Sequence, residues 1–191
     1  MNTATTVERE IKLAFESVEA ARTAVIAAGA TPLLGRRLQE DALLDTEDEQ
    51  LRKRRCVLRV RVECGKSRLT FKGPVQPGIM KLREELETVV GDGDVVLRVL
   101  QELGLSVWFR YEKYREEFAH EDVIVAIDET PVGVFIEIEG SEAGIASMAQ
   151  ALGRSADDYV VDSYRGLFLQ HRQALGLKGP DMVFDAVDGR V

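Results

Sequence analysis

Several segments of the chain alternate between apolar and polar residues with a period of two. In residues 7–13, one side of this alternation carries Glu8, Glu10 and Lys12, and the other includes Ile11 and Leu13. Successive side chains of a β-strand point to opposite faces, so this pattern predicts a strand. The same reasoning predicts further strands at residues 37–44, 57–64, 68–72, 81–90, 106–118, 123–127 and 134–139.

Helical spacing is found in fewer places. Ser17 offers an N-cap for a helix that Gly29 would end, Asp94 offers one for a helix at 95–103, and Ser141 one for a helix reaching residue 152. A last helix is predicted at residues 162–175. Strands outnumber helices and their connections are short, so we expect an α+β fold with antiparallel neighbours. Residues 1–176 are predicted to form one domain, and residues 177–191 a weakly patterned, partly flexible tail.

Ionisable residues recur at positions i, i+2 and i+4 on the polar side of most predicted strands. After the first strand, the series continues with Arg59, Arg61 and Glu63, then Arg83, Glu85 and Glu87, then Glu112, and finally Glu137 and Glu139. A charged stripe on one strand is typical of an ordinary solvated sheet face. Its recurrence on strand after strand favours one shared, charged surface.

The residue types in this series indicate a chemistry. Adjacent glutamates on one face repel each other unless a cation lies between them. Mg²⁺ and Mn²⁺ prefer oxygen ligands and commonly bind through a few carboxylates together with substrate phosphates. Arginines and lysines facing the same space would hold those phosphates. If the sheet closes into a barrel, these faces point inward, and the apolar faces point outward and are covered by helices.

Composition narrows the class of protein. The chain has 191 residues, a net charge of −8 and 45% hydrophobic residues, which fits one folded domain and disfavours a protein that coats nucleic acid. No apolar run approaches the roughly 20 residues of a membrane span, and residues 1–9 contain no apolar signal core. We therefore expect a cytoplasmic protein with no membrane and no nucleic-acid partner.

Other conspicuous residues have plain interpretations. Cys56 and Cys64 support no disulfide, zinc or thiol-enzyme site, and His120 and His171 are interpreted as surface residues. Trp108 is interpreted as a packing residue, with base stacking as the alternative. The basic run at residues 52–55 is interpreted as a solvated turn or a barrel rim, with electrostatic guidance of a polyanion as the alternative.

An ordered series of motifs resembles the CYTH superfamily, which includes thiamine triphosphatases, class IV adenylate cyclases and inorganic triphosphatases. The opening Glu8-Arg9-Glu10-Ile11-Lys12 is similar to the E-x-E-x-K motif of that family. The likeness continues through Leu58-Arg59-Val60-Arg61, Leu69-Thr70-Phe71-Lys72-Gly73-Pro74, Arg83 to Glu87, Lys113-Tyr114-Arg115, Ile127-Asp128 and Phe135-Ile136-Glu137-Ile138-Glu139-Gly140. The resemblance implies an eight-stranded antiparallel β-barrel, open as a tunnel to a triphosphate, with helices packed outside.

The same resemblance implies roles for individual residues. Mg²⁺ or Mn²⁺ would be held by Glu8, Glu10, Glu85, Asp128, Glu137 and Glu139, with Glu87 as a close alternative to Glu85. The phosphates would be held by Lys12, Arg59, Arg61, Lys72, Arg83, Lys113 and Arg115. In many family members a tyrosine precedes the aspartate of a segment like Leu43-Leu44-Asp45-Thr46, and leucine takes its place here. A tyrosine–lysine base is therefore not expected, and the catalytic residue stays unassigned.

The resemblance leaves the reaction open. The first hypothesis is metal-dependent hydrolysis of an inorganic or organic triphosphate: tripolyphosphate, thiamine triphosphate or ATP. The alternative is a class IV adenylate cyclase, which would need a nucleoside pocket at one mouth of the tunnel. A third is a non-catalytic binder of such ligands, which the full set of metal-binding carboxylates disfavours. A homodimer is compatible with each hypothesis.

Overall fold

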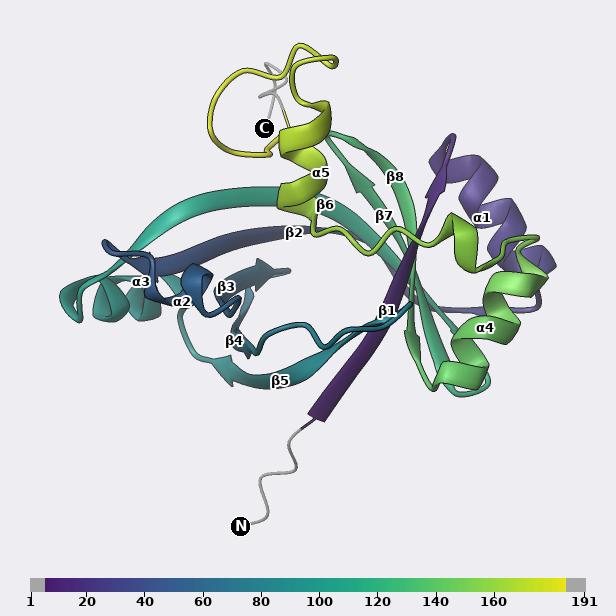
Figure 1. Cartoon of the computed structure of the whole chain (residues 1–191), viewed down its shortest axis with the longest axis horizontal. Helices are drawn as coiled ribbons and strands as arrows, with labels where there is room; N and C mark the ends of the chain where they lie inside the picture. Colours follow the sequence, from purple (N-terminus) through teal and green to yellow (C-terminus); the bar gives the residue numbers. More distant parts are fainter. Residues whose placement is uncertain (1–5, 185–191) are drawn as a thin grey trace.

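The computed structural model describes residues 6–184, and eight antiparallel strands form a closed barrel within them (Figure 1). Around the barrel the order is β1-β5-β4-β3-β2-β6-β7-β8, with β8 hydrogen-bonded to β1. The strands are β1 (Thr6–Phe15), β2 (Thr31–Thr46), β3 (Val57–Glu63), β4 (Lys66–Lys72), β5 (Lys81–Val90), β6 (Leu105–His120), β7 (Val123–Thr130) and β8 (Gly133–Gly140). The expected α+β class and eight-stranded antiparallel barrel are confirmed.

Most strands are longer than the sequence predicted, β2 by the largest margin. β2 begins at Thr31 rather than residue 37, and β6 runs from Leu105 to His120. Their pairing shifts register between Pro32 and Leu34 and between Leu34 and Arg37. Such irregularities interrupt the alternation of side chains, and residues 31–36 are exposed, so the period-two signal is lost there. The bounds of β5 match the prediction.

Helices α1 (Val18–Ala27) and α4 (Glu142–Ala151) cover the outside of the barrel beside β1, β7 and β8 (Figure 1). The Oγ of Ser17 accepts from the N–H of Ala20 at 3.1 Å, and the Oγ of Ser141 accepts from that of Gly144 at 2.9 Å, as expected of N-caps. Under these helices lies a core made of outward-facing strand residues and helix residues, including Ile11, Leu13, Val25, Ile136, Ile138, Ile145 and Met148. Burial of this face holds the two helices on the sheet.

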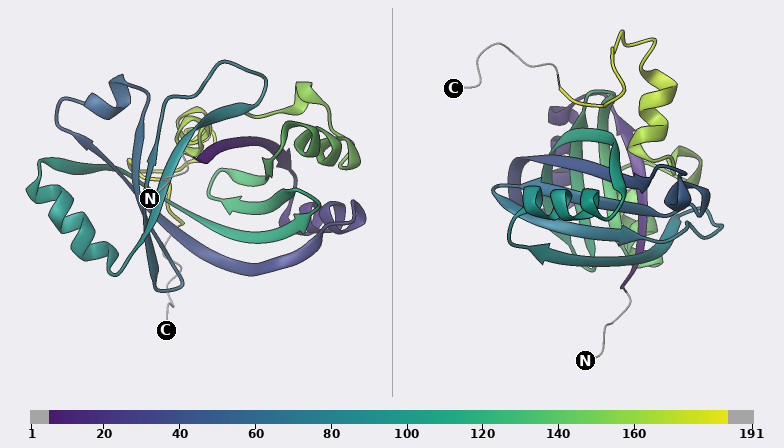
Figure 2. Two further views of the ribbon diagram at one scale, coloured as in Figure 1. Left: turned by 90° about the horizontal axis from the view of Figure 1, so that it is seen from below. Right: turned by 90° about the vertical axis from the view of Figure 1, so that its left-hand side faces the viewer.

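Helices do not cover the whole outward apolar face of the barrel, so the expectation that they would is wrong in part. Helix α3 (Gly93–Glu102) lies at the end of the barrel opposite α1 and α4 (Figure 2), and Leu86 on the outside of β5 is exposed. The cap of α3 was also predicted wrongly. The carboxylate of Asp92, not that of Asp94, accepts from the N–H groups of Asp94 and Val95, at 2.9 and 3.0 Å.

Three further helices differ from prediction as well. The helix expected at residues 162–175 is the shorter α5 (Tyr164–His171), and the short helices α2 (Gln50–Lys53) and η1 (Ala156–Asp158) were not predicted. The partly flexible tail stays a prediction; in its described part, the backbone of Met182 bonds to Arg110 and Glu112 of β6, with N···O distances of 3.0 and 2.9 Å. The remainder of that prediction, residues 185–191, lies outside the described residues. No helix that the structure describes is long and apolar enough to cross a membrane.

Candidate functional site

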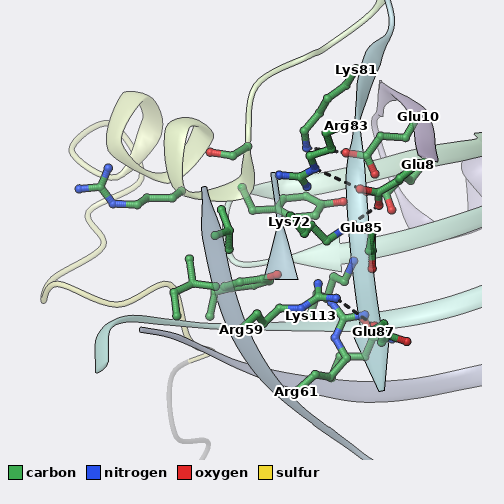
Figure 3. Close-up of a pocket in the computed structure, with 18 of the residues that line it drawn as sticks. Glu8, Glu10, Arg59, Arg61, Lys72, Lys81, Arg83, Glu85, Glu87 and Lys113 are labelled. Carbon is green, nitrogen blue, oxygen red and sulfur yellow. Dashed lines mark hydrogen bonds and ion pairs between the residues drawn. The ribbon is translucent and has the colours of Figure 1, made fainter. Parts of the chain in front are cut away.

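A cavity of about 650 Å³ runs inside the barrel, and its wall is made mostly of charged side chains (Figure 3). The predicted phosphate-binding residues all line it: Lys12, Arg59, Arg61, Lys72, Arg83, Lys113 and Arg115. The carboxylates that line it include Glu8, Glu10, Glu85, Glu87, Glu137 and Glu139. Asp128 lies behind the wall. Glu112 does not follow the rule seen on the other strands, because it faces away from the cavity and accepts from the N–H of Phe184.

Strand pairing explains how acids and bases come to face each other. Across β1 and β5, Glu8 lies opposite Arg83, and across β1 and β8, Lys12 lies opposite Glu137. Lys72 of β4 similarly lies opposite Glu85 of β5. Directly opposed residues on one face of an antiparallel pair are close neighbours, so each cation acquires a carboxylate partner. The charges that alternate along the sequence become ion pairs across strands.

The β1 carboxylates lie among several lysine and arginine side chains. Glu8 contacts Lys72 Nζ at 2.6 Å and Arg83 Nε at 3.1 Å (Figure 3). Burial and the neighbouring Glu10 oppose ionisation of Glu8, but Lys72 and Arg83 outweigh them and hold its pKa below the usual value. Lys12 lies between Glu10 and Glu137, at 3.1 and 3.3 Å. Despite its burial, these two carboxylates raise the pKa of Lys12, so it remains charged.

Glu139 differs from the other acids of the cavity. Among residues 6–184 its carboxylate has no hydrogen bond and no ion pair within 4 Å, whereas Glu8, Glu10 and Glu137 each have two cationic partners. Burial, followed by the negative charges of Glu8, Glu137 and Glu10, raises its pKa to about 7. The cavity therefore carries uncompensated negative charge at this point of β8, which a bound cation would relieve.

The opposite wall is dominated by arginines. Asp41 of β2 is fully buried as a side chain, and Arg61 contacts both of its oxygens, at 2.9 and 3.1 Å. Arg59 Nε lies 3.4 Å from Asp41, and no described group accepts a hydrogen bond from that nitrogen. A buried N–H without an acceptor is costly unless a ligand or water supplies one. Arg59 is therefore the clearest donor available to an anion.

Asp128 holds cations in place from behind the wall. Its two oxygens accept from Lys113 at 2.7 Å, from Arg115 through two bonds of 2.7 Å, and from the Tyr164 hydroxyl at 2.6 Å. Burial opposes its ionisation, but Arg115 and Lys113 keep its pKa below the usual value. With both oxygens occupied, Asp128 orients Lys113 and Arg115 in this structure, while Arg115 also contacts Glu137 at 2.6 Å.

The sequence interpretation missed several residues of this site. Lys81 precedes Arg83 by two positions and faces the cavity, and Asp41 shares a face with Leu43, so the alternation could have found both. Tyr164 had no such signal, because α5 brings it in from outside the strand pattern. Burial and the nearby Lys12 lower the pKa of Lys81 to about 8, and burial and Arg115 lower that of Lys113 to about 8.

The carboxylates fit a hard divalent ion in kind, but not yet in arrangement. Within residues 6–184, no group of three or more His, Cys, Asp and Glu side chains is positioned around a single point to hold a metal ion. The reason is visible in the contacts, since lysines lie between Glu10 and Glu137 and between Glu8 and Glu85. Oxygen donors on β1, β5 and β8 nevertheless suit Mg²⁺ or Mn²⁺. Binding would require Lys12 and Lys72 to turn from the acids toward phosphate.

Comparison with known proteins identifies relatives of this barrel. The CYTH domain family matches residues 6–164. A protein of Methanocaldococcus jannaschii described as a candidate adenylate cyclase is 31% identical over 146 residues, covering 69% of this chain and 83% of its own length.

Two solved structures are similar in fold. A candidate adenylate cyclase from Vibrio parahaemolyticus superposes with a TM-score of 0.76 at 19% identity, over 86% of this chain and 99% of its own. A protein from Hippeastrum, described as a candidate adenylyl cyclase with dominant triphosphatase activity, gives a TM-score of 0.65 at 20% identity, over 85% of this chain and 95% of its own.

Proposed function

This chain belongs to the CYTH domain family, and from that premise we propose that it is a metal-dependent triphosphatase that hydrolyses a triphosphate inside its barrel. The observation that carries the proposal is one cavity lined by carboxylates of β1, β5 and β8 together with arginines and lysines of β3, β4 and β6. Hydrolysis of a triphosphate needs both, because the phosphates must be gripped and their charge neutralised. The triphosphatase activity attributed to the Hippeastrum protein supports the same reaction class.

The cations of the cavity would bind the phosphates. Arg59 and Arg61 present guanidinium groups from β3, and Lys72 lies on the neighbouring β4. Lys113 and Arg115 approach from β6, held by Asp128. Because these groups come from several strands, a chain of phosphates contacts more of them than a single phosphate does. The cavity therefore favours a triphosphate over orthophosphate.

The carboxylates would hold the metal. Glu8, Glu10, Glu137 and Glu139 lie on neighbouring strands, where Glu10 pairs with Glu139 and Lys12 with Glu137, and Glu85 and Glu87 lie nearby on β5. Mg²⁺ or Mn²⁺, when bound, would neutralise phosphate oxygens and favour attack by water. Asp128 contributes by orienting Lys113 and Arg115, since its own oxygens are occupied.

The reaction forms a bond between a water oxygen and the terminal phosphorus. The bond from that phosphorus to the bridging oxygen breaks, and the electron pair leaves with the diphosphate end of the substrate. The water proton passes to a group on the wall with a near-neutral pKa. Lys81, with a pKa lowered to about 8, meets that requirement, whereas Glu139 is assigned to the metal and Leu43, which also lines the cavity, cannot accept a proton.

The second candidate is an adenylate cyclase that uses the same cavity. The description of the Methanocaldococcus jannaschii relative favours it. In that reaction the 3′-hydroxyl of ATP would attack the α-phosphorus, and pyrophosphate would leave.

A substrate panel tests the proposal. Tripolyphosphate, thiamine triphosphate and ATP are incubated with the protein and Mg²⁺ or Mn²⁺, and the products are analysed for orthophosphate, pyrophosphate and cyclic AMP. Metal-dependent release of orthophosphate is the expected result, and EDTA should stop it. Formation of cyclic AMP with pyrophosphate would support the cyclase in place of the hydrolase. No product with any substrate would contradict both functions.

Metal affinity should depend on pH through Glu139. The carboxylate must lose its proton to bind metal, and its pKa is raised to about 7, so affinity should rise as the pH rises through 7. We expect Mn²⁺ to bind about tenfold more weakly at pH 6 than at pH 8. Calorimetric titration at both pH values measures this.

Two variants show which group is responsible. Glu139→Gln should bind Mn²⁺ more weakly and almost equally at pH 6 and pH 8. His120 and His171 do not line the cavity, so a protein with both replaced by glutamine should keep the wild-type dependence. A steep pH dependence that persists in Glu139→Gln would assign it to another group.

A further inference from the structure

Tyr164 reaches the cavity wall from α5, a helix that lies beyond the strands of the barrel (Figure 1). It is the first residue of that helix, and Ser163 caps the helix because its Oγ accepts from the N–H of Gly166 at 3.1 Å. The side chain of Tyr164 is buried. A strand residue of the wall takes its direction from the barrel, whereas the packing of α5 sets the direction of Tyr164. The position of α5 therefore decides what this side chain contacts.

The hydroxyl of Tyr164 contacts the carboxylate that orients two cations of β6. It donates to Oδ2 of Asp128 at 2.6 Å, and the same oxygen accepts from Lys113 Nζ and from Arg115 Nη2, each at 2.7 Å. Burial, followed by the charge of Asp128, raises the pKa of Tyr164, so the hydroxyl keeps its proton and serves as a donor rather than as a base. Three donors around one oxygen leave the carboxylate little freedom to rotate. The hydroxyl therefore helps to fix the direction of Lys113 and Arg115.

The ring of Tyr164 lies against two ammonium groups. Nζ of Lys12 is 5.3 Å from the centre of the ring, and Nζ of Lys113 is 5.0 Å from it. Both distances are within the roughly 6 Å over which the face of an aromatic ring attracts a cation. Lys12 belongs to β1 and Lys113 to β6, two strands that β7 and β8 separate in the barrel. One side chain from α5 therefore contacts cations that the sheet itself does not bring together.

Tyr164 is itself held by the barrel. Its ring meets that of Phe135 edge to face, with centres 5.8 Å apart, and lies 6.2 Å from the ring of Tyr111. Four residues before it, the N–H of Val160 donates to the carbonyl oxygen of Lys12 at 2.8 Å. The segment that leads into α5 is thus bonded to β1 at the residue whose ammonium group Tyr164 contacts.

Further contacts hold α5 beside the cavity. The guanidinium carbon of Arg165 is 4.7 Å from the centre of the Trp108 ring, and that of Arg52 is 4.3 Å from the same ring, so α2 and α5 meet at one mouth of the cavity. Phe168 is buried against Phe109 of β6, with ring centres 5.9 Å apart. These contacts keep the first turn of α5, and with it Tyr164, in a fixed place.

We propose that Tyr164 is a positioning residue for the phosphate-binding cations: its hydroxyl fixes Lys113 and Arg115 through Asp128, and its ring holds Lys12 and Lys113. The inference rests on the proposed function for the binding of phosphates by these cations. It goes further by making α5, a helix outside the barrel, part of the binding machinery. Because Tyr164 acts on the cations, it should affect the binding of phosphates and leave the binding of metal unchanged.

Calorimetric titration of two variants with imidotriphosphate, in the presence of Mg²⁺, tests the proposal. Tyr164→Phe removes the hydroxyl and keeps the ring, so we expect about tenfold weaker binding, the size of one hydrogen bond to a charged group. Tyr164→Leu also removes the ring and should lose about threefold more. Mn²⁺ without phosphate should bind Tyr164→Phe as tightly as the wild type. Unchanged affinity of Tyr164→Phe for imidotriphosphate would overturn the proposal, and so would weaker binding of Mn²⁺.

Phe168→Leu is the matched control. Phe168 is a buried aromatic residue of the same helix and does not line the cavity. Its replacement should lower the melting temperature, because packing of α5 is lost, but leave the affinity for imidotriphosphate unchanged. If it weakened binding as much as Tyr164→Phe does, the effect would come from the packing of α5, and the role of the Tyr164 hydroxyl would be refuted.

A double-mutant cycle with Lys113→Met shows whether Tyr164 acts through the cations. The loss of affinity in the combined variant should be smaller than the product of the two single losses, because Lys113 is one of the groups that Tyr164 positions. Losses that simply multiply would overturn the proposal. Binding of imidotriphosphate requires no turnover, so an absence of hydrolysis in the substrate panel would reject the proposed reaction, whereas these affinities alone decide the role of Tyr164.

Discussion

Replacement of both Glu137 and Glu139 by glutamine is expected to abolish metal-dependent hydrolysis, with a loss of more than about 100-fold in kcat/KM. These two side chains are the carboxylates of β8 that line the cavity. Glutamine keeps their size and one oxygen acceptor but removes the charge that attracts a divalent cation. Activity with Mg²⁺ and with Mn²⁺ is measured by orthophosphate release from the best substrate of the panel.

The fold should survive this double substitution. Arg115 keeps its bonds to Asp128, and Lys12 keeps its contact with Glu10. Removal of Glu139's charge also relieves its repulsion with Glu8 and Glu10. Circular dichroism and thermal unfolding check this. The matched control replaces Glu40 and Glu84, two exposed strand glutamates outside the cavity, and should retain full activity. Full activity of the β8 double variant would refute the metal assignment.

The substitution Arg59→Ala is expected to weaken tripolyphosphate binding by about 10- to 100-fold, the size of one charge-assisted hydrogen bond. Arg59 is chosen over Arg61 because its Nε lacks an acceptor, whereas Arg61 forms two bonds with the buried Asp41. Removal of Arg61 would leave a buried carboxylate poorly compensated and destabilise the barrel. Binding is measured by isothermal titration calorimetry in the presence of metal.

Orthophosphate provides the contrast for this variant. A single phosphate can bind against any of the other cations of the wall, so its affinity should fall much less than that of tripolyphosphate. Arg98→Ala, on the exposed outer surface of α3, removes one positive charge far from the cavity and should change neither affinity. Equal losses of affinity for both ligands in Arg59→Ala would contradict a binding site that contacts several phosphates at once.

The alternation of side chains in the sequence was sufficient to place most of the charged wall. A strand directs every second residue to the same face, so the position of Glu8 fixed the facing of Glu10 and Lys12, all three of which line the cavity. The same rule placed Glu85 and Glu87 of β5, and likewise the two glutamates of β8, on the side that lines the cavity. This information is local and is carried by a handful of consecutive residues.

The rule failed in two places. It placed Glu112 with the charged series, although the opposite face of β6, which carries Tyr111, Lys113, Arg115 and Glu117, lines the cavity. Charged residues lie on both faces of this strand, so alternation alone does not decide which face is inward. The rule also missed the start of β2, where register shifts interrupt the alternation. There the facing of a side chain depends on how the neighbouring strand is paired, which a single segment does not reveal.

By itself, then, the sequence predicted the strands and their charged faces, and its resemblance to the CYTH superfamily predicted the closed barrel that the structure has, whereas phosphate and metal binding inside it stay predictions. Only the tertiary structure decided which charges are partners, because ion pairs such as Lys72 with Glu8 join residues far apart in the chain. It also decided that Asp128 supports Lys113 and Arg115, and that Arg52, Trp108 and Arg165 meet at one mouth. A strand pattern fixes the direction of a side chain, but contact between distant elements depends on how the barrel closes and where its helices pack.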